Sequence, residues 1–258
     1  MPLAAVMLVS QGAGLVGIVA VVAASGVPAP SFWEMAPALG AGLAGALALA
    51  AFYQALAIGT MSIVAPVSAT GVAVPVAYGV AGGEAPAALQ IAGIVAAIAG
   101  VVLASREPVP AAGPAPPDGP ARSRRPVTLA LLAAVGFGSF FVGMDASAEH
   151  DVFWALLAAR TASVGVLLAA VAVLRPSLRT GRRSLRILIA VGGLDLLANA
   201  CFAVASTEGL LSVVSVLGSL YPVTTVVLAR LILRERVTRG QETGIVLALA
   251  GVALIAAG

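Results

Sequence analysis

The sequence has few charged residues and few of the residues that most often carry catalysis or bind metals. Only 10% of its 258 residues are charged, and all fourteen basic residues are Arg. The single cysteine, Cys201, excludes a disulfide framework and a cysteine metal site. The single histidine, His150, stands between Glu149 and Asp151 in a predicted exposed loop, and these neighbours alone do not form a metal shell.

Enzyme signatures are missing as well. No glycine-rich phosphate loop follows a strand, and no lipase, protease or kinase motif occurs. We therefore predict neither an enzyme nor a bound metal or cofactor. Because no nucleotide-binding domain is present, any concentrating transport has to use an ion gradient or exchange.

What the sequence does contain is apolar residues in long runs. Hydrophobic residues make up 60% of the chain, and the mean hydropathy is +1.08. Runs of about 20 apolar residues match a hydrocarbon core of about 30 Å, in which a helix satisfies its own backbone hydrogen bonds. The isoelectric point near 9.7 comes from Arg in the loops between runs, and so does not indicate nucleic-acid binding. The fold class is therefore an all-α polytopic membrane protein.

Nine hydrophobic segments are predicted as transmembrane helices. One long linker, residues 106–126, holds seven prolines and has Arg at both ends, so we expect it to be extended and solvated. It separates a first half, 1–105, from a second half, 127–258. The nine segments are residues 3–24, 35–57, 62–82, 87–104, 127–144, 153–174, 185–206, 210–233 and 241–257.

The two halves repeat the same residues at the same spacings. A set of four in the first half recurs in the second with a constant offset of 151. Gly42, Phe52 and Ser62 recur at an offset of 150, and Gln11 falls near Arg160 at 149. A fixed internal period indicates a duplicated architecture. The set of four is Glu84, Gln90, Gly93 and Gly100, repeated as Glu235, Gln241, Gly244 and Gly251.

Arg placement predicts that the repeats are inverted. The loops at 106–126, 175–186 and 234–239 are rich in Arg, whereas those at 25–34, 82–86 and 145–151 have none. With nine spans the two sets lie on opposite sides of the membrane, and the positive-inside rule assigns the first set to the cytoplasm. The C-terminus is then outside, and the two halves cross the membrane in opposite senses.

The second half resembles a known family. Residues 210–251, LLSVVSVLGSLYPVTTVVLARLILRERVTRGQETGIVLALAG, resemble the EamA-type domain of the drug/metabolite transporter superfamily in their Pro-containing penultimate helix, acidic turn residue and Gly-spaced last helix. The resemblance covers nearly the whole chain as two copies and implies ten helices in two inverted five-helix repeats around a central cavity. This sequence lacks the first of those helices, through a late start codon or a truncation. The family also implies a cytoplasmic C-terminus, against the Arg count.

Few ionisable residues fall inside the predicted spans, and each is costly there and thus a functional candidate. Asp195 lies near the middle of the seventh segment, and Asn199 follows on the same helix face. In one interpretation these two side chains line a cavity and contact substrate, and Asp195 exchanges a proton. In the other, they form a helix-packing hydrogen bond or an ion pair. For Arg160 there are three interpretations: it contacts an anionic substrate group, neutralises Asp195, or snorkels to the interface. Gln11 is a further polar lining candidate.

Prolines interrupt the third and eighth segments. A proline removes a backbone hydrogen bond and favours a kink, and kinks at matching positions of two repeats point to a substrate site. The same prolines can shape helices without touching substrate. Candidates here are Pro66, Pro75, Thr70, Ser215, Ser219, Tyr221 and Pro222.

Small and acidic residues are interpreted structurally. The spaced glycines, with the cluster at Gly40, Gly42 and Gly45, are expected to let helix backbones approach closely. Glu84 and Glu235 are expected in turns, each capping the helix that follows it.

Together these features predict a multi-pass protein of the cell membrane that transports a small metabolite by alternating access. The resemblance favours export, and protons are the candidate coupling ion. The alternative is a membrane-embedded structural or interaction protein without transport activity.

Overall fold

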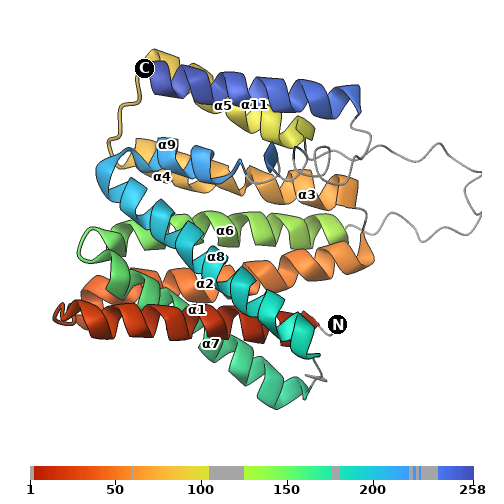
Figure 1. Ribbon diagram of the computed structural model, residues 1–258. Coiled ribbons are helices and arrows are strands. Elements are labelled where there is room, and N and C mark those ends of the chain that lie inside the picture. The colour runs from red at the N-terminus through yellow and green to blue at the C-terminus, as the bar shows by residue number, and fades with distance from the viewer. Residues whose placement is uncertain are drawn as a thin grey trace, which may run out of the picture. The chain divides into compact units, whose positions relative to one another are not determined.

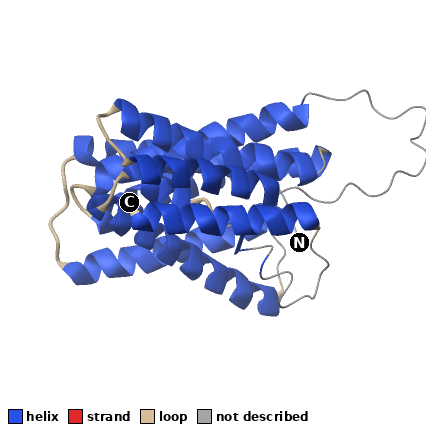
Figure 2. Ribbon diagram, turned by 90° about the horizontal axis from the view of Figure 1, so that it is seen from above, coloured by secondary structure: helices blue, strands red, loops and turns tan. Residues whose placement is uncertain are grey.

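A computed structural model describes residues 3–59, 61–104, 125–175, 181–220, 223–224, 227 and 238–258. Every regular element in those ranges is a helix (Figures 1 and 2). The helices are α1 (Leu3–Ser25), α2 (Phe32–Ile58), α3 (Met61–Ala69), the 3-10 turn η1 (Thr70–Val72), α4 (Ala73–Ala81), α5 (Ala88–Ala104), α6 (Arg125–Ala148), α7 (Val152–Leu174), α8 (Arg182–Glu208), α9 (Leu211–Gly218) and α11 (Arg239–Ala257).

The helices coincide with the predicted segments. Six of them are long and apolar enough to cross a membrane: α1, α2, α6, α7, α8 and α11. Shorter apolar helices cover Val67–Ala81 and Ala88–Ala104. The predicted eighth segment is described mainly at its start, as α9. The all-α class is therefore confirmed for the described residues.

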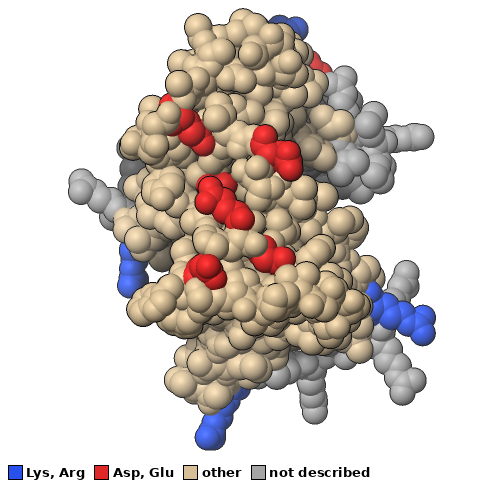
Figure 3. Space-filling view, turned by 90° about the vertical axis from the view of Figure 1, so that its left-hand side faces the viewer, with Lys and Arg blue, Asp and Glu red and all other residues tan. Residues whose placement is uncertain are grey.

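The surface is largely uncharged, as a lipid-facing protein requires. Large apolar side chains are exposed on several helices, including Val16 on α1, Leu131 on α6 and Leu194 on α8. Figure 3 shows acidic side chains as separate patches on a surface made mostly of uncharged residues. A helix that is apolar on all sides is typical of a membrane span.

The third predicted segment is interrupted, as its prolines suggest. The α-helical hydrogen-bond pattern ends at Ala69, tightens into η1 and resumes in α4, where Pro75 is the third residue. Pro75 has no N–H to donate to the carbonyl four residues earlier, that of Gly71 within η1. Thr70 donates its hydroxyl to the Val67 carbonyl of the preceding turn at 2.6 Å and is exposed.

The chain forms two compact units, described here separately. Unit 1 is Met1–Leu47 with Ser139–Gly209, and unit 2 is Ala48–Gly138 with Leu210–Gly258. Each unit therefore combines helices from both halves of the sequence. The unit boundaries fall inside α2 and α6.

In unit 2, α5 and α11 pack side by side along their lengths (Figure 1). A Cβ added to Gly93 would overlap Gly251 and Ile255, and one added to Gly244 would overlap Gly100 and Ala104. The predicted packing role of these glycines is confirmed. Since residue numbers rise along one helix as they fall along the other, the pair is antiparallel.

The contacts between α5 and α11 follow the internal repeat, because equivalent residues of the two halves make equivalent contacts. Gly93 meets Gly251, and the repeat counterparts of those two residues, Gly244 and Gly100, meet each other. Both helices also begin alike. Gln90 accepts from the Ala87 N–H at 2.8 Å, and its counterpart Gln241 accepts from the Thr238 N–H at 3.0 Å as half of a capping box.

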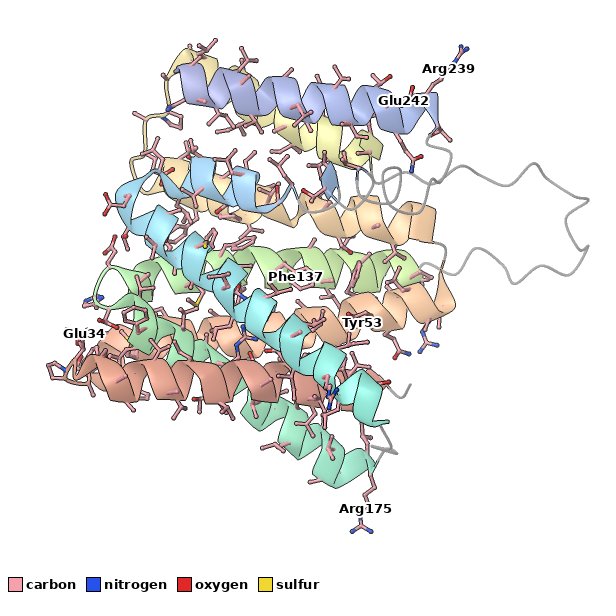
Figure 4. The ribbon with its side chains drawn as sticks, in the orientation of Figure 1. Glu34, Tyr53, Phe137, Arg175, Arg239 and Glu242 are labelled. Atoms are coloured by element: carbon pink, nitrogen blue, oxygen red, sulfur yellow. The ribbon has the colours of Figure 1, made fainter. Side chains whose placement is uncertain are left out.

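Several helix ends carry charged residues or caps. Asp151 caps α7 by accepting from the Trp154 N–H at 2.8 Å, and Arg175 ends the same helix with a φ of 45°. Arg239 and Glu242 lie in the first turn of α11 (Figure 4). Tyr53 is near the C-terminal end of α2, where the neighbouring Phe52 ring lies 6.1 Å from that of Phe137.

Candidate functional site

The most polar buried feature of unit 1 is an ion pair between α7 and α8. Arg160 Nη2 lies 2.8 Å from Asp195 Oδ2. The Arg160 side chain is only 7% exposed, whereas that of Asp195 is 44% exposed. Of the alternatives for Arg160, neutralisation of Asp195 is the one observed, and the guanidinium is buried rather than extended to an interface.

Gln11 joins the pair from α1. Its Oε1 accepts a hydrogen bond from Arg160 Nη1, so that one guanidinium connects α1, α7 and α8. A buried charge is tolerated when it is paired and hydrogen-bonded, and both conditions are met here. Three candidates from the sequence are thus brought together: Gln11, Arg160 and Asp195.

Glycines allow these helices to approach closely enough for the contacts to form. A Cβ on Gly192 would overlap the Ser10 carbonyl of α1, and Asp195 lies one turn further along α8. The crossing therefore brings Asp195 near Gln11, the residue after Ser10. Gly14 of α1 lies against the guanidinium, where a Cβ would be in ordinary van der Waals contact, 3.4 Å from Arg160 Nε.

A matching crossing holds α7 against α2 within unit 1. A Cβ on Gly42, the repeat counterpart of Gly192, would overlap the carbonyl of Ala159, next to Arg160. Ser163 donates its hydroxyl to the Gly42 carbonyl at 2.9 Å. Gly45 approaches Phe140, whereas Gly40 has no atom within 4 Å of an added Cβ. The packing prediction is thus confirmed for Gly42 and Gly45 and wrong for Gly40, which faces open space.

Asn199 has a local role in this structure. Its Nδ2 donates to the backbone carbonyl of Asp195 at 2.8 Å, one turn earlier in α8. The two residues share a helix face as predicted, but Asn199 bonds to the main chain of Asp195, and the Asp195 carboxylate pairs with Arg160 instead.

Two hydroxyl candidates, Ser215 in α9 and Ser219 at its C-terminal cap, lie in unit 2. Ser215 is fully buried and its Oγ has no hydrogen-bond partner, as is also true of Ser212. Ser219 is buried but donates to the Val216 carbonyl at 2.8 Å.

Glu84 caps a different helix from the one expected. Its Oε1 accepts from the Leu211 N–H at 2.6 Å and its Oε2 from the Ser212 N–H at 3.1 Å, both at the start of α9. The prediction that it caps α5, the helix that follows it, is therefore wrong. The first turn of α5 is capped by Gln90 instead, which leaves the carboxylate free to reach the N-terminus of a helix from the other half.

Comparison with known proteins decides the family. The sequence model of the EamA-like transporter family matches residues 124–257, just over half of the chain. The chain belongs to the EamA-like transporter family. It is accordingly an integral, multi-pass membrane protein of a transporter family within the drug/metabolite transporter superfamily, and that family is not enzymatic.

The fold of this EamA-like protein also occurs among solved structures. One crystal structure of a protein superposes with a TM-score of 0.79 over 99% of this chain and 89% of the other, at 18% sequence identity. Similarity at that identity establishes the fold alone. No curated protein sequence matches the chain.

Ser147 of the EamA-like protein is a buried polar contact that sequence reasoning missed. Its Oγ accepts from the Ala38 N–H and donates to the Glu34 carbonyl, each at 2.9 Å. The hydroxyl from α6 thus bridges two backbone groups of α2 that a regular helix joins directly. The available signal was Pro37, which has no N–H to donate to the Trp33 carbonyl one turn earlier in α2.

The remaining candidates are placed as follows. Tyr221, Pro222 and Glu235 lie outside the described residues, as does the side chain of Pro66. His150 is exposed in a turn, 3.9 Å from Glu34. Within the described ranges, no group of three His, Cys, Asp or Glu side chains is arranged to hold a metal ion.

Proposed function

We propose that this EamA-like protein is a secondary transporter that moves a small metabolite across the cell membrane by alternating access, with Arg160, Asp195 and Gln11 as its functional centre. The observation that carries this proposal is the buried Arg160 guanidinium paired with the partly exposed Asp195 carboxylate. An ionised residue within an apolar helix bundle is expensive and is retained at substrate or ion pathways.

The charges of the centre limit what it can bind. Arg160 and Asp195 compensate each other, and Gln11 and Asn199 are neutral, so the group has no net charge. Arg160 is enclosed and occupied, while the Asp195 carboxylate is 44% exposed and is paired through Oδ2. The carboxylate is therefore the group that a substrate donor or a proton can reach.

This accessibility suggests how binding is coupled to movement. A donor or proton that binds Asp195 competes with Arg160, and the pair joins α7 to α8. A ligand shifts a conformational equilibrium by as much as its affinity differs between the states. A ligand that weakens the pair therefore favours a state in which α7 and α8 separate.

Reciprocal contacts support an inverted-repeat organisation, with repeats at 1–105 and 127–258 joined by the linker 106–126. Gly42 crosses α7 as its counterpart Gly192 crosses α1, and Gln11 bonds to Arg160, close to its own counterpart position. Contacts between equivalent residues arise at a two-fold axis. An axis perpendicular to antiparallel helices such as α5 and α11 lies in the membrane plane, as inverted repeats require. Nine spans and export remain part of this proposal.

The test compares metabolites inside and outside cells with and without the protein. The variants are Arg160→Gln and Asp195→Asn, with Thr161→Ala as the control because Thr161 is the exposed neighbour of Arg160 on α7. All are compared at equal membrane abundance. A compound redistributed by the intact protein and by Thr161→Ala, but at least about tenfold less by the other two, supports transport through this centre.

Two outcomes would contradict the proposal, and a third would remove proton coupling from it. Redistribution that survives both charge-removing variants places the substrate path elsewhere in the protein. A lack of redistribution under several growth conditions favours the structural or interaction role. Transport by Asp195→Asn with unchanged pH dependence would exclude this carboxylate as the proton-coupling group.

A further inference from the structure

Unit 2 contains buried hydroxyl groups that no other part of the unit satisfies. Ser212 and Ser215 of α9 are 0% exposed, and Ser68 of α3 is 3% exposed. None of their Oγ atoms has a hydrogen-bond partner. A buried hydroxyl without a partner costs free energy relative to a hydrated one, and such groups are rare in folded proteins. This cost is removed in a conformation in which water or a ligand reaches the hydroxyls.

The two α9 hydroxyls share a helix face. Ser212 and Ser215 are three residues apart and so lie on the same side of the helix, with Val216 beside Ser212 at the edge of that face. Val213 lies about 160° around the helix from Ser215, at about 100° per residue, and packs against the apolar cluster that contains Val72 and Ile94. Ser215 and Val213 therefore represent the polar and the apolar side of α9.

The N-terminus of α9 is held by a carboxylate from the turn after α4. Glu84 accepts from the first two N–H groups of α9, at 2.6 and 3.1 Å. Charge-assisted bonds of this kind are stronger than neutral ones. Gly79 of α4 makes room for them, since a Cβ there would overlap the Glu84 carboxylate. Because α4 also packs along α9, the carboxylate fastens one end of the α4/α9 interface.

We propose that the serine face of α9 is a second polar site, closed in this structure, which takes up water and an uncharged, hydrogen-bonding part of the substrate when α9 moves away from α4. Glu84 is the positioning residue that keeps it closed. Hydroxyls donate and accept but carry no charge, which suits a neutral group. This inference rests on the proposed transport function, because a transporter alternates between conformations.

The experiment measures access of water to this face. Cys201, the single cysteine, is replaced by Ser, and Ser215→Cys and Val213→Cys are introduced separately. Membranes are treated with a small charged methanethiosulfonate, which reacts with the thiolate that forms in water. We expect Ser215→Cys to react at least about tenfold faster than Val213→Cys, because only the serine face is hydrated when α9 moves. Equal rates, or an unreactive Ser215→Cys, overturn the proposal.

A second variant tests whether Glu84 keeps the serine face of α9 closed. Glu84→Gln keeps the size of the side chain but removes its charge, and should raise the reaction rate of Ser215→Cys about fivefold to tenfold without changing that of Val213→Cys. An unchanged Ser215→Cys rate refutes the role of Glu84, and a rise at both positions indicates general loosening and refutes the site.

The result is separable from the transport assay. The expected labelling pattern without redistribution of any metabolite would refute transport and leave a closed polar site. Transport without that pattern would refute only this inference.

Discussion

The two units differ in how they handle buried polar side chains. Among the described residues, unit 1 buries Ser147, Arg160 and Ser206, and each has at least one hydrogen-bond partner. Unit 2 buries Ser68, Ser212 and Ser215 without any, and its fourth buried serine, Ser219, bonds only within its own turn, to the Val216 carbonyl. Fully buried polar side chains therefore join helices in unit 1, through Ser147 and Arg160, but not in unit 2.

Both units have close backbone contacts at glycines, and in unit 2 the α5/α11 pair depends on them. The hydroxyls of Ser68, Ser212 and Ser215 make no hydrogen bond in this conformation and so do not hold its helices together. Buried polar groups inside this membrane protein therefore have two different roles. Paired groups specify which helices meet, whereas unpaired groups mark a surface whose partners are present in another conformation.

The largest change in stability is expected from breaking the ion pair of unit 1. Asp195→Asn leaves the buried Arg160 without its counter-charge and should lower the free energy of unfolding by about 2 kcal/mol. That is less than for a fully buried pair, because Asp195 is 44% exposed and its charge is screened. Thermal unfolding in detergent measures the change.

The double variant Arg160→Gln/Asp195→Asn is the control for that measurement. It removes both charges and should recover most of the lost stability while transport stays lost. If the two single losses simply add in the double variant, the residues do not act as a pair.

The next effect concerns the crossing of α8 with α1. Gly192→Ala forces a Cβ into the Ser10 carbonyl and should destabilise the protein by about 1–3 kcal/mol. Gly193 is the matched control, because its added Cβ meets no atom within 4 Å. Gly193→Ala should stabilise by up to about 1 kcal/mol through helix propensity. Equal shifts in the unfolding midpoint would show that the crossing is looser than described.

Two serine-to-alanine substitutions are expected to change the stability of the two units in opposite directions. Ser147→Ala removes a hydroxyl with two partners and should cost about 1 kcal/mol, whereas Ser215→Ala removes an unpaired one and should stabilise by a similar amount. Thermal unfolding of the two variants against the parent protein gives both signs. A loss of stability in Ser215→Ala would mean that its hydroxyl is satisfied in the folded protein.

The smallest effect tests the start of α7, the helix that carries Arg160. Asp151→Ala removes the acceptor for the Trp154 N–H and should cost about 0.5–1 kcal/mol. Glu149→Ala, in the same turn and exposed, serves as the control. Indistinguishable unfolding midpoints for the two variants would show that the Asp151 cap does not stabilise α7.

Much of the fold could be predicted from the sequence because its signals are local. Apolar length located the helices, Pro75 marked the interrupted third segment, and the spacing of Gly93 and Gly100 indicated a close helix contact. Candidate residues were also found locally, since Arg160 and Asp195 are rare charges in apolar runs.

The pairings could not be predicted in the same way, because they depend on tertiary placement. The repeat aligned Gln11 with Arg160, but alignment of equivalent residues does not say that they touch. Glu84 was expected to cap the helix next to it in sequence, whereas the helix it caps begins 127 residues later. Ser147 resembles any other small residue of an apolar run until α2 lies against it.

The long-range cap at Glu84 has a consequence for biogenesis. The ribosome synthesises Glu84 well before Leu211 and Ser212, so the acceptor is already in the membrane when α9 emerges with its unpaired N–H groups. Gln11 likewise precedes Arg160. The first half of the chain thus acts as a template on which the second half completes its assembly, and co-expression of the two halves as separate polypeptides should yield more membrane-inserted second half than its expression alone.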